Sequence, residues 1–518
     1  MSGQPLVHDG DWKQRAKWLE GPEGGYFRLE TDDVAQVPVR LFVTQKLLTE
    51  AEPTLYRQIV NATRFPGVRM VCVTPDVHYG YGVPVGCVIL TERTEGADRG
   101  DHAGRAGGSG GSVAMGPVGF DIGCGMMSAK SSVPAERATP DRKLEFNREV
   151  MSRVSLGAGG KSVKLGKLGE REFENLVRGG AEYYVDEYGA SFDRSRAERH
   201  RIPVDDGWEI PWGGKGTPER GRDQLGSLGG GNHFIELQRE EATQTLFVQV
   251  HTGSRGFGHG LATNYFQMAK DERPEVTDID LGYFTPDSTH FHDYLNAVAA
   301  GGNFAILNRL IIFEQIAEAF RKVFKEDLEL LYEISHNLVQ AETHPEVGDV
   351  WVHRKGATRA FPGGHPALAG TPWEHSGHPV LIPGSNRDYS YVLRPLAGAV
   401  KSGYSVNHGA GRRMSRGEAM RVLDQHKVNE QYRRDDILVN LDGKVPLDES
   451  SACYKSCAEV IESVVSAGLA KVEHQLWPLA SIKGNEESAG REKRQARKGK
   501  DRSRERDRDA ARKTKGHF

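Results

Sequence analysis

Seven segments of the sequence, six of them containing glycine, carry histidine, asparagine, aspartate or cysteine, and several directly follow a run of strand-forming residues. They are 75–86, 119–125, 225–237, 250–260, 334–342, 381–391 and 407–416. Loops at the ends of strands are common places for binding and catalytic side chains. A single loop of this kind is most often structural. Seven in one chain are hard to explain in that way, and they indicate a site assembled from distant segments.

Five side chains in these segments have the chemistry of metal ligands: Asp121, Cys124, His233, His251 and His336. One carboxylate, one thiol and three imidazoles suit a borderline divalent ion such as Zn²⁺, Mn²⁺, Fe²⁺ or Co²⁺. A structural zinc site usually shows close pairs of Cys or His. Here only Asp121 and Cys124 are close in sequence, which favours an open catalytic site gathered from several loops.

Two of the segments have the composition of phosphate-binding loops. Residues 251–256 (HTGSRG) and 408–412 (HGAGR) combine glycine amides with an arginine. Backbone N–H groups at the start of a helix, together with a guanidinium, bind phosphate readily. An imidazole beside such a phosphate can act as an acid, a base or a nucleophile, so His408 is a candidate for one of these roles. Capping or packing is the ordinary alternative for a single histidine.

The elements that must position these residues are both strands and helices. Short β-branched runs predict strands at 68–77, 84–90, 245–253, 349–360 and 378–385. Helical periodicity predicts helices at 303–328 and 453–472, and Ser415 with Glu418 has the spacing of a capping box. Residues 190–222 and 356–378 are predicted to form long surface loops. Without an internal repeat or linker, we expect one large α+β domain over residues 1–484.

Composition excludes several classes of protein. The chain has 518 residues, of which 37% are hydrophobic, enough for a substantial core. Five cysteines do not suggest a disulfide framework, and the charged N-terminus does not resemble a signal peptide. No run approaches the roughly 18 apolar residues of a membrane span. We therefore expect a soluble cytoplasmic protein that makes no membrane contact.

The net charge of −3 conceals an asymmetry. Residues 485–518 hold 13 Lys and Arg against 7 Asp and Glu, a net charge of +6, which leaves −9 on residues 1–484. This segment has almost no apolar residues and is predicted to be a disordered basic tail able to contact polyanions. A purely solubilising tail is the alternative.

The order of the motifs resembles the RtcB family of RNA-splicing ligases. The matching segments are PDVHYGYG, GFDIGCGM, QLGSLGGGNHFIEL, HTGSRG, SHN, VHRKGATRA, LIPGS, NHGAGRRMSR and PLASIKG. The resemblance runs from about residue 36 to residue 484. It implies the family's own α+β fold, here with mixed and antiparallel sheets and surrounding helices. It also implies joining of RNA 2′,3′-cyclic phosphate or 3′-phosphate ends to 5′-hydroxyl ends with GTP and Mn²⁺.

The resemblance implies a role for each metal-ligand candidate and for His408. Asp121 and Cys124 would bind two manganese ions, with the sulfur of Cys124 bridging them. His233 would hold one ion, and His251 and His336 would complete the second. His408 would be the nucleophile that becomes guanylylated before the guanylyl group passes to the RNA 3′-phosphate.

The resemblance further implies a nucleotide site, RNA contacts and partners. Arg255 and Arg412 are candidates for the RNA phosphate. An archease-like activator is a further expected partner, and we expect a monomer. The GTP-binding residues would be Asn232, His233, Phe234, Ile235, Glu236, His336, Asn337, Pro383, Gly384, Ser385, Asn386, Ser390, His408, Gly409, Ala410, Gly411, Tyr454 and Lys483.

The chain departs from the family pattern in places. After LIPGS the family usually continues Met-Gly-Thr, whereas this chain has Asn386, Arg387 and Asp388. The sequence is therefore identified as a divergent member, in tRNA splicing or RNA repair. Two alternatives stay open: a metal-dependent cyclic phosphodiesterase or nucleotidyltransferase that does not ligate, and a non-catalytic RNA-binding homologue. The presence of all five ligand candidates and His408 disfavours the second alternative.

Overall fold

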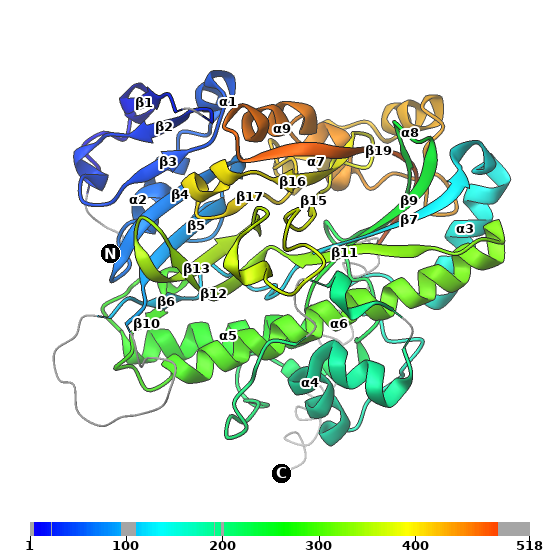
Figure 1. The fold of residues 1–518 in the computed structure, drawn as a ribbon, viewed down its shortest axis with the longest axis horizontal. Helices are drawn as coiled ribbons and strands as arrows, with labels where there is room; N and C mark the ends of the chain where they lie inside the picture. The colour runs from blue at the N-terminus through cyan, green and yellow to red at the C-terminus, as the bar shows by residue number, and fades with distance from the viewer. Residues whose placement is uncertain (1–4, 22, 95–109, 191, 198–200, 485–518) are drawn as a thin grey trace, which may run out of the picture.

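The computed structural model describes residues 5–21, 23–94, 110–190, 192–197 and 201–484, and it builds them around two large sheets (Figure 1). Helices surround these sheets, which confirms the predicted α+β fold. The predicted tail, 485–518, lies outside the described residues.

The first sheet has seven strands in the order β1-β2-β3-β4-β5-β13-β12. All neighbours are antiparallel except β3 and β4. Its N-terminal half packs on two short helices, α1 (Gln45–Glu50) and α2 (Leu55–Ala62), through one apolar cluster. The strands are Ala16–Leu19 (β1), Tyr26–Leu29 (β2), Val39–Leu41 (β3), Val68–His78 (β4), Val85–Glu92 (β5), Asn337–His344 (β12) and Gly348–Lys355 (β13).

The second sheet has the order β11-β7-β9-β8-β19-β16-β15, with β18 added beside β19. Only the β18–β19 pair is parallel. Its strands are Gly125–Pro134 (β7), Phe234–Glu240 (β8), Thr245–Thr252 (β9), Glu329–Ser335 (β11), Val380–Ile382 (β15), Ser390–Pro395 (β16), Leu438–Val439 (β18) and Ala470–Lys483 (β19). Two small pairs complete the strands: β6 (Val113–Ala114) with β10 (Tyr283–Phe284), and β14 (Ala357–Arg359) with β17 (Ser405–Asn407).

Helix α6 (Phe291–Phe324) is the centre of the largest apolar cluster. In Figure 1 it runs below the two large sheets, with α4 on its other side. Its apolar stretch is long enough to cross a membrane, but 94% of that stretch is buried inside the protein, as in the core helix of a soluble protein. The other helices are α3 (Pro140–Arg153), α4 (Glu170–Tyr188), α5 (Arg255–Glu272), α7 (Arg416–Val422), α8 (Gln425–Arg434) and α9 (Cys457–Ser466).

The sequence-based elements are confirmed in type and less well in extent. All five predicted strand regions contain strands, and Ser415 caps α7 by accepting a hydrogen bond from Glu418 N at 3.2 Å. The helix predicted at 303–328 begins earlier, at Phe291, and the one predicted at 453–472 ends at Ser466. Gly468, with φ of 67°, reverses the chain into β19. The prediction of a surface loop over 356–378 is wrong for its first residues, because 357–359 form the buried strand β14.

Candidate active site

A cavity of about 480 Å³ opens where β4 and β12 of the first sheet meet β8 and β9 of the second. Loops before β7, after β15 and after β17 supply the other walls. The structure therefore brings distant glycine-rich segments to one place, as the sequence predicted. The predicted site residues that line the cavity are Asp121, Cys124, Asn232, Phe234, Glu236, His251, His336, Asn337, Pro383, Gly384, Ser385, Asn386, His408, Gly409, Ala410, Gly411, Arg412, Tyr454 and Lys483.

Four predicted site residues do not line the cavity. His233 lies behind its wall, within 3.0 Å of Asp121 Oδ2. Ile235 is buried in the core cluster around α6, because alternate side chains of β8 face opposite sides of the sheet. Ser390 Oγ accepts a hydrogen bond from Gly384 N at 3.0 Å and so supports the wall from outside. The side chain of Arg255 donates to Gly157 O at 2.8 Å, and its proposed RNA contact stays a prediction.

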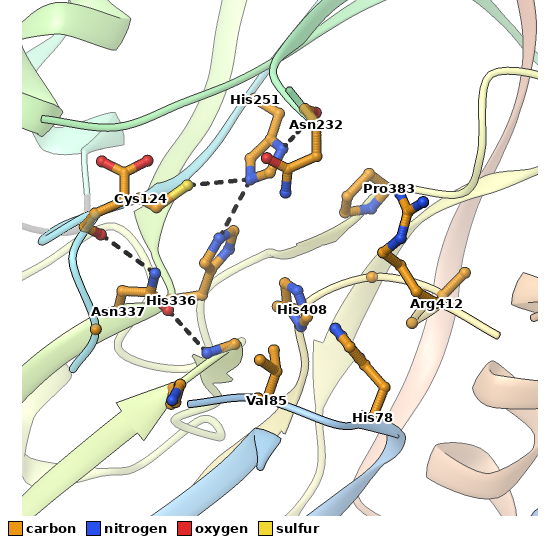
Figure 2. A pocket seen from close by; sticks show the side chains of 18 of the residues that line it. His78, Val85, Cys124, Asn232, His251, His336, Asn337, Pro383, His408 and Arg412 are labelled. Atoms are coloured by element: carbon orange, nitrogen blue, oxygen red, sulfur yellow. Dashed lines mark hydrogen bonds between the residues drawn. The ribbon is translucent and has the colours of Figure 1, made fainter. Parts of the chain in front are cut away.

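The five metal-ligand candidates gather at the edge of the cavity, where Figure 2 shows Cys124, His251 and His336 pointing toward one another. They form two overlapping groups, Cys124 with His251 and His336, and Cys124 with Asp121 and His233. Within each group the ligand atoms lie within 4.8 Å of one another. Sγ of Cys124 lies 3.3 Å from His251 Nε2 and 3.7 Å from His233 Nε2. Cys124 is the residue common to both groups, and the bridging role that the resemblance implies for its sulfur stays a prediction.

The orientation of the imidazoles fits bound cations. Nδ1 of His233 lies 3.0 Å from Leu228 O, and Nδ1 of His251 lies 3.1 Å from Asn232 O. A carbonyl can only accept, so each Nδ1 carries the proton and each Nε2 lone pair faces the sulfur. Nε2 of His251 also faces Nε2 of His336 at 3.3 Å. The lone pair of His251 Nε2 at this distance is satisfied either by a proton on His336 Nε2 or by a shared cation, and backbone carbonyls behind ligating histidines are typical of metal sites.

The buried environment sets the charges of these donors. Burial lowers the pKa of His251 and His336 well below the ordinary value, so both rings are neutral and can act as ligands. Burial raises the pKa of Asp121, but the neighbouring His233 outweighs it and brings the pKa to about 2. The carboxylate is therefore ionised throughout the physiological range. Two neutral imidazoles together with an ionised carboxylate and a thiol suit a borderline divalent ion.

Glycines let the backbone carry these ligands close together. Gly123 has φ of 72°, and a Cβ there would lie 2.8 Å from the Cβ of Ala305 on α6. A Cβ at Gly253 would lie 2.2 Å from Asp121 Oδ1. A side chain at either position would displace α6 or the carboxylate. The glycines flanking the acid and the thiol thus serve close approach.

Arg309, which the sequence gave no reason to select, holds three ligand-bearing segments together. Its fully buried guanidinium on α6 donates to Gly123 O, Thr252 O and Ser335 Oγ, each at 2.8 Å. Each of these three residues directly precedes or follows a metal-ligand candidate. Glu333 pairs with the guanidinium and balances its charge. Arg309 is therefore a positioning residue for the ligand cluster.

His408 is backed by a buried carboxylate, Asp76. Oδ2 of Asp76 lies 2.6 Å from His408 Nδ1 and accepts hydrogen bonds from the backbone N–H of His408 at 3.1 Å and of Gly409 at 3.2 Å. Thr74 Oγ1 donates to the other oxygen at 2.6 Å. Burial raises the pKa of Asp76, but the adjacent His408 outweighs it and holds the pKa below the ordinary value. A carboxylate this close to Nδ1 favours the tautomer with the proton on Nδ1, which leaves Nε2 as the nucleophilic nitrogen.

Two histidines flank the ring of His408. The centroid of the His336 ring lies 5.0 Å away, so the nucleophile candidate is next to the ligand cluster (Figure 2). On the other side, the ring of His78 stacks at 6.4 Å with an interplanar angle of 26°. Burial lowers the pKa of His78 to about 4, so this ring is neutral. Asp76 and His78 belong to a segment that the sequence singled out, but neither was assigned a role there.

Another end of the cavity combines a carboxylate, an aromatic ring and cations. Glu236 is buried, accepts a hydrogen bond from Gln238 Nε2 at 2.8 Å, and has a pKa raised to about 7 by burial. Lys483 Nζ lies 5.4 Å from the centroid of the Phe234 ring. Cross-strand pairing of β8 with β19 places these groups side by side. An acceptor next to an apolar ring is suited to a purine base.

Glu449, a second residue that the sequence did not select, links this end to Arg412. One carboxylate oxygen accepts from Tyr454 OH at 2.5 Å and lies 3.6 Å from Lys483 Nζ. The other lies 3.4 Å from Arg412 Nη1 and 2.9 Å from Arg416 Nη2. Burial raises the pKa of Glu449, but Lys483 and the arginines outweigh it and keep the group ionised. Tyr454 and Lys483, predicted to bind the nucleotide, and Arg412, predicted to bind RNA, therefore all contact the carboxylate of Glu449.

The divergent loop after Ser385 is anchored by neighbouring helices. Asn386 Oδ1 accepts a hydrogen bond from Tyr432 OH at 2.5 Å, and Arg387 pairs with Asp435 at 2.5 Å. Asp388 Oδ2 accepts from Cys457 N at 2.9 Å. Only Asn386 among the three loop residues lines the cavity. Two of the three residues that depart from the family pattern therefore hold the loop in place from outside the cavity, and only Asn386 contributes to the cavity surface.

Comparison with known proteins identifies the family. A model of the family described as tRNA-splicing ligase RtcB matches residues 58–484. The chain belongs to the RtcB family. The tRNA-splicing ligase RtcB of Pyrobaculum aerophilum is 33% identical over 87% of this chain and 95% of its own, and that of Nanoarchaeum equitans is 34% identical over 86% and 95%. The RNA-splicing ligase RtcB of Mycobacterium tuberculosis is 33% identical over 82% of this chain and its own full length.

Membership of the RtcB family confirms the resemblance seen in the motifs and makes the chain an RNA ligase by family. The family match ends at residue 484, where the described residues also end. The ligand cluster, His408 and the cavity all lie within the matched range. The site described above is therefore the candidate active site of an RtcB-family ligase.

Proposed function

We propose that this RtcB-family protein joins RNA 2′,3′-cyclic phosphate or 3′-phosphate ends to 5′-hydroxyl ends, using GTP and Mn²⁺. The observation that carries the proposal is the position of His408. Its ring lies between the buried carboxylate of Asp76 and the ring of His336, which belongs to the ligand cluster. A nucleophilic imidazole with an orienting carboxylate next to a metal cluster suits nucleotidyl transfer.

The protein supplies the nucleophile and its orientation. Asp76 holds Nδ1 of His408, so Nε2 attacks the α-phosphorus of GTP. An N–P bond forms, the bond from the α-phosphorus to the bridging oxygen breaks, and pyrophosphate leaves with the electron pair. The carboxylate stabilises the positive charge that develops on the imidazole. Two Mn²⁺ ions held by Asp121, Cys124, His233, His251 and His336 would neutralise phosphate charge during these displacements.

Two further displacements complete the reaction. An oxygen of the RNA 3′-phosphate attacks the guanylyl phosphorus, the N–P bond breaks, and His408 is regenerated. The 5′-hydroxyl of the second RNA then attacks the activated 3′-phosphate, loses its proton, and releases GMP. A 2′,3′-cyclic phosphate end is first opened by water to the 3′-phosphate. Arg412, which lines the cavity beside the His408 loop, would contact the RNA phosphate.

The purine-binding end of the cavity supports guanosine as the nucleoside. In its ionised form, the carboxylate of Glu236 can accept hydrogen bonds from the N–H groups on the Watson–Crick edge of guanine. Adenine presents an unprotonated ring nitrogen at the same place and would repel it. Phe234 offers an apolar surface, and Tyr454 and Lys483 complete the wall.

The proposal is tested by joining two RNA oligonucleotides, one with a 3′-phosphate and one with a 5′-hydroxyl. The expected result is a joined product that requires both GTP and Mn²⁺ and disappears with His408→Ala. Removal of a cyclic phosphate without joining would instead identify a phosphodiesterase. Binding of RNA without either reaction would identify a non-catalytic homologue. Either outcome would contradict the proposal.

A further inference from the structure

The mouth of the cavity carries two exposed tyrosines that none of the steps above uses. Tyr79 is 56% exposed and Tyr81 is 69% exposed, and both line the cavity. Isolated exposed aromatic residues are common and need no explanation. Two exposed tyrosines on one short loop, at the entrance to a site that contains the nucleophile candidate, do need an explanation.

The backbone of this loop is fixed, so the rings are held outward. Gln58 on α2 binds both the N–H and the carbonyl of Gly80, at 2.9 Å and 2.5 Å. Asn61 donates to Gly82 O at 2.9 Å. The buried amine of Lys355 donates to Tyr81 O at 2.7 Å. Because side chains of two other elements hold the loop, the exposure of the rings is a feature of the fold and not of a loose segment.

Sequence adjacency places the rings near the reacting phosphate. Tyr79 directly follows His78, whose ring stacks on that of His408. Any RNA phosphate that accepts the guanylyl group from His408 must lie next to the ring of His408. The base attached to that terminal nucleotide therefore lies within reach of the loop.

Other residues lining the cavity suit a single RNA strand. Phe120 and Phe266 line it and stack on each other at 4.7 Å, which adds an apolar stretch to its wall. Lys355 and Arg412 supply positive charge to the cavity wall. Aromatic rings next to cationic groups are the usual means of binding unpaired nucleotides without sequence preference.

We propose that Tyr79 and Tyr81 stack on the terminal bases of the RNA strand that carries the 3′-phosphate. This inference rests on the proposed function, because it requires an RNA 3′-phosphate at His408. The tyrosines act on bases and not on the nucleotide cofactor. The site is sequence-tolerant, since every base offers an aromatic face.

The test measures binding of a short single-stranded RNA with a 3′-phosphate, and it needs no turnover. Tyr79→Ala and Tyr81→Ala are each expected to weaken binding by about 5- to 100-fold, and Phe at either position should restore most of it. Tyr188→Ala, at a 40% exposed tyrosine on α4, is the matched control and should bind like wild type. Thermal unfolding of each variant verifies folding.

RNA lacking its two terminal bases at the 3′-phosphate end separates stacking from other effects. Wild type should lose affinity for this abasic RNA, while the double variant should bind abasic and intact RNA equally. The proposal would be overturned if the tyrosine substitutions weakened binding of abasic RNA as much as binding of intact RNA. Sensitivity confined to bases at the 5′-hydroxyl end, or no loss at all, would also overturn it. Failure of the proposed ligation would give a different result. The wild-type protein would then form no joined RNA but would still bind intact RNA more tightly than abasic RNA.

Discussion

Replacing Asp76 with asparagine tests how His408 is activated. The substitution preserves size in a fully buried position, so the fold should persist. It removes the negative charge 2.6 Å from His408 Nδ1 and leaves an amide that can present either oxygen or nitrogen to the ring. The hydrogen bonds that the side chain accepts from the backbone N–H groups of His408 and Gly409 are also weakened, because an amide oxygen is a weaker acceptor than a carboxylate.

The expected loss follows from these contacts. A hydrogen bond to a charged group contributes about 1.5–3 kcal/mol, which corresponds to about 10- to 150-fold. A wrong histidine tautomer adds to this, and in serine proteases the equivalent Asp to Asn change costs about 10⁴-fold. We therefore expect the guanylylation rate of Asp76→Asn to fall by about 10²- to 10⁴-fold. GTP affinity should change little, because Asp76 lies behind His408.

The assay is single-turnover transfer of label from α-labelled GTP to the protein over a range of GTP concentrations. The dependence on concentration separates the rate of transfer from the affinity for GTP. Thr74→Val is the control, because it removes only the hydrogen bond to the other carboxylate oxygen and should cost about 10-fold or less. Transfer by Asp76→Asn within about 3-fold of wild type would refute the assigned role of Asp76.

Three further predictions concern the metal cluster and the purine-binding end. Cys124→Ala should reduce Mn²⁺ binding, measured by equilibrium dialysis, from two ions to one or none, because the sulfur belongs to both ligand groups; two ions bound as tightly as in wild type would contradict this. Arg309→Lys should weaken Mn²⁺ binding by about 10- to 100-fold, since positioning contacts behind metal ligands have this effect, and unchanged affinity would contradict it. The pKa of Glu236 is raised from 4.5 to about 7, so the folded protein binds the extra proton and wild-type stability should fall as the pH rises through this interval. Glu236→Gln should remove this dependence and be more stable above pH 7 by up to about 3 kcal/mol in denaturant unfolding, whereas parallel pH profiles would count against it.

The sequence predicted the ligand cluster well because its chemistry is local. The donors sit in four short segments, three of them rich in glycine, and residue type identifies each donor as a candidate ligand. The cluster at Cys124 shows that the four segments carrying these donors meet. The fold class was also predictable, since alternating apolar runs and one long apolar helix leave few alternatives.

The residues that hold these groups in place were not predictable. Asp76 lies 332 positions from His408, and only the fold brings them together. Arg309 lies inside an apolar helix, where a lone arginine is normally assigned to the surface. Glu449 is one of several acids in a polar stretch, and three of its four partners, Arg412, Arg416 and Lys483, come from other segments. Such contacts depend on tertiary packing, which short-range patterns do not encode.

The central claim is that His408 accepts the guanylyl group of GTP. The most direct measurement is incubation of the protein with α-labelled GTP and Mn²⁺, followed by tests of the label's chemistry. The structure predicts a protein-bound label that is acid-labile, resists hydroxylamine, and is absent from His408→Ala and Cys124→Ala. A label that persists in His408→Ala, or no label on metal-loaded wild-type protein, would contradict the account.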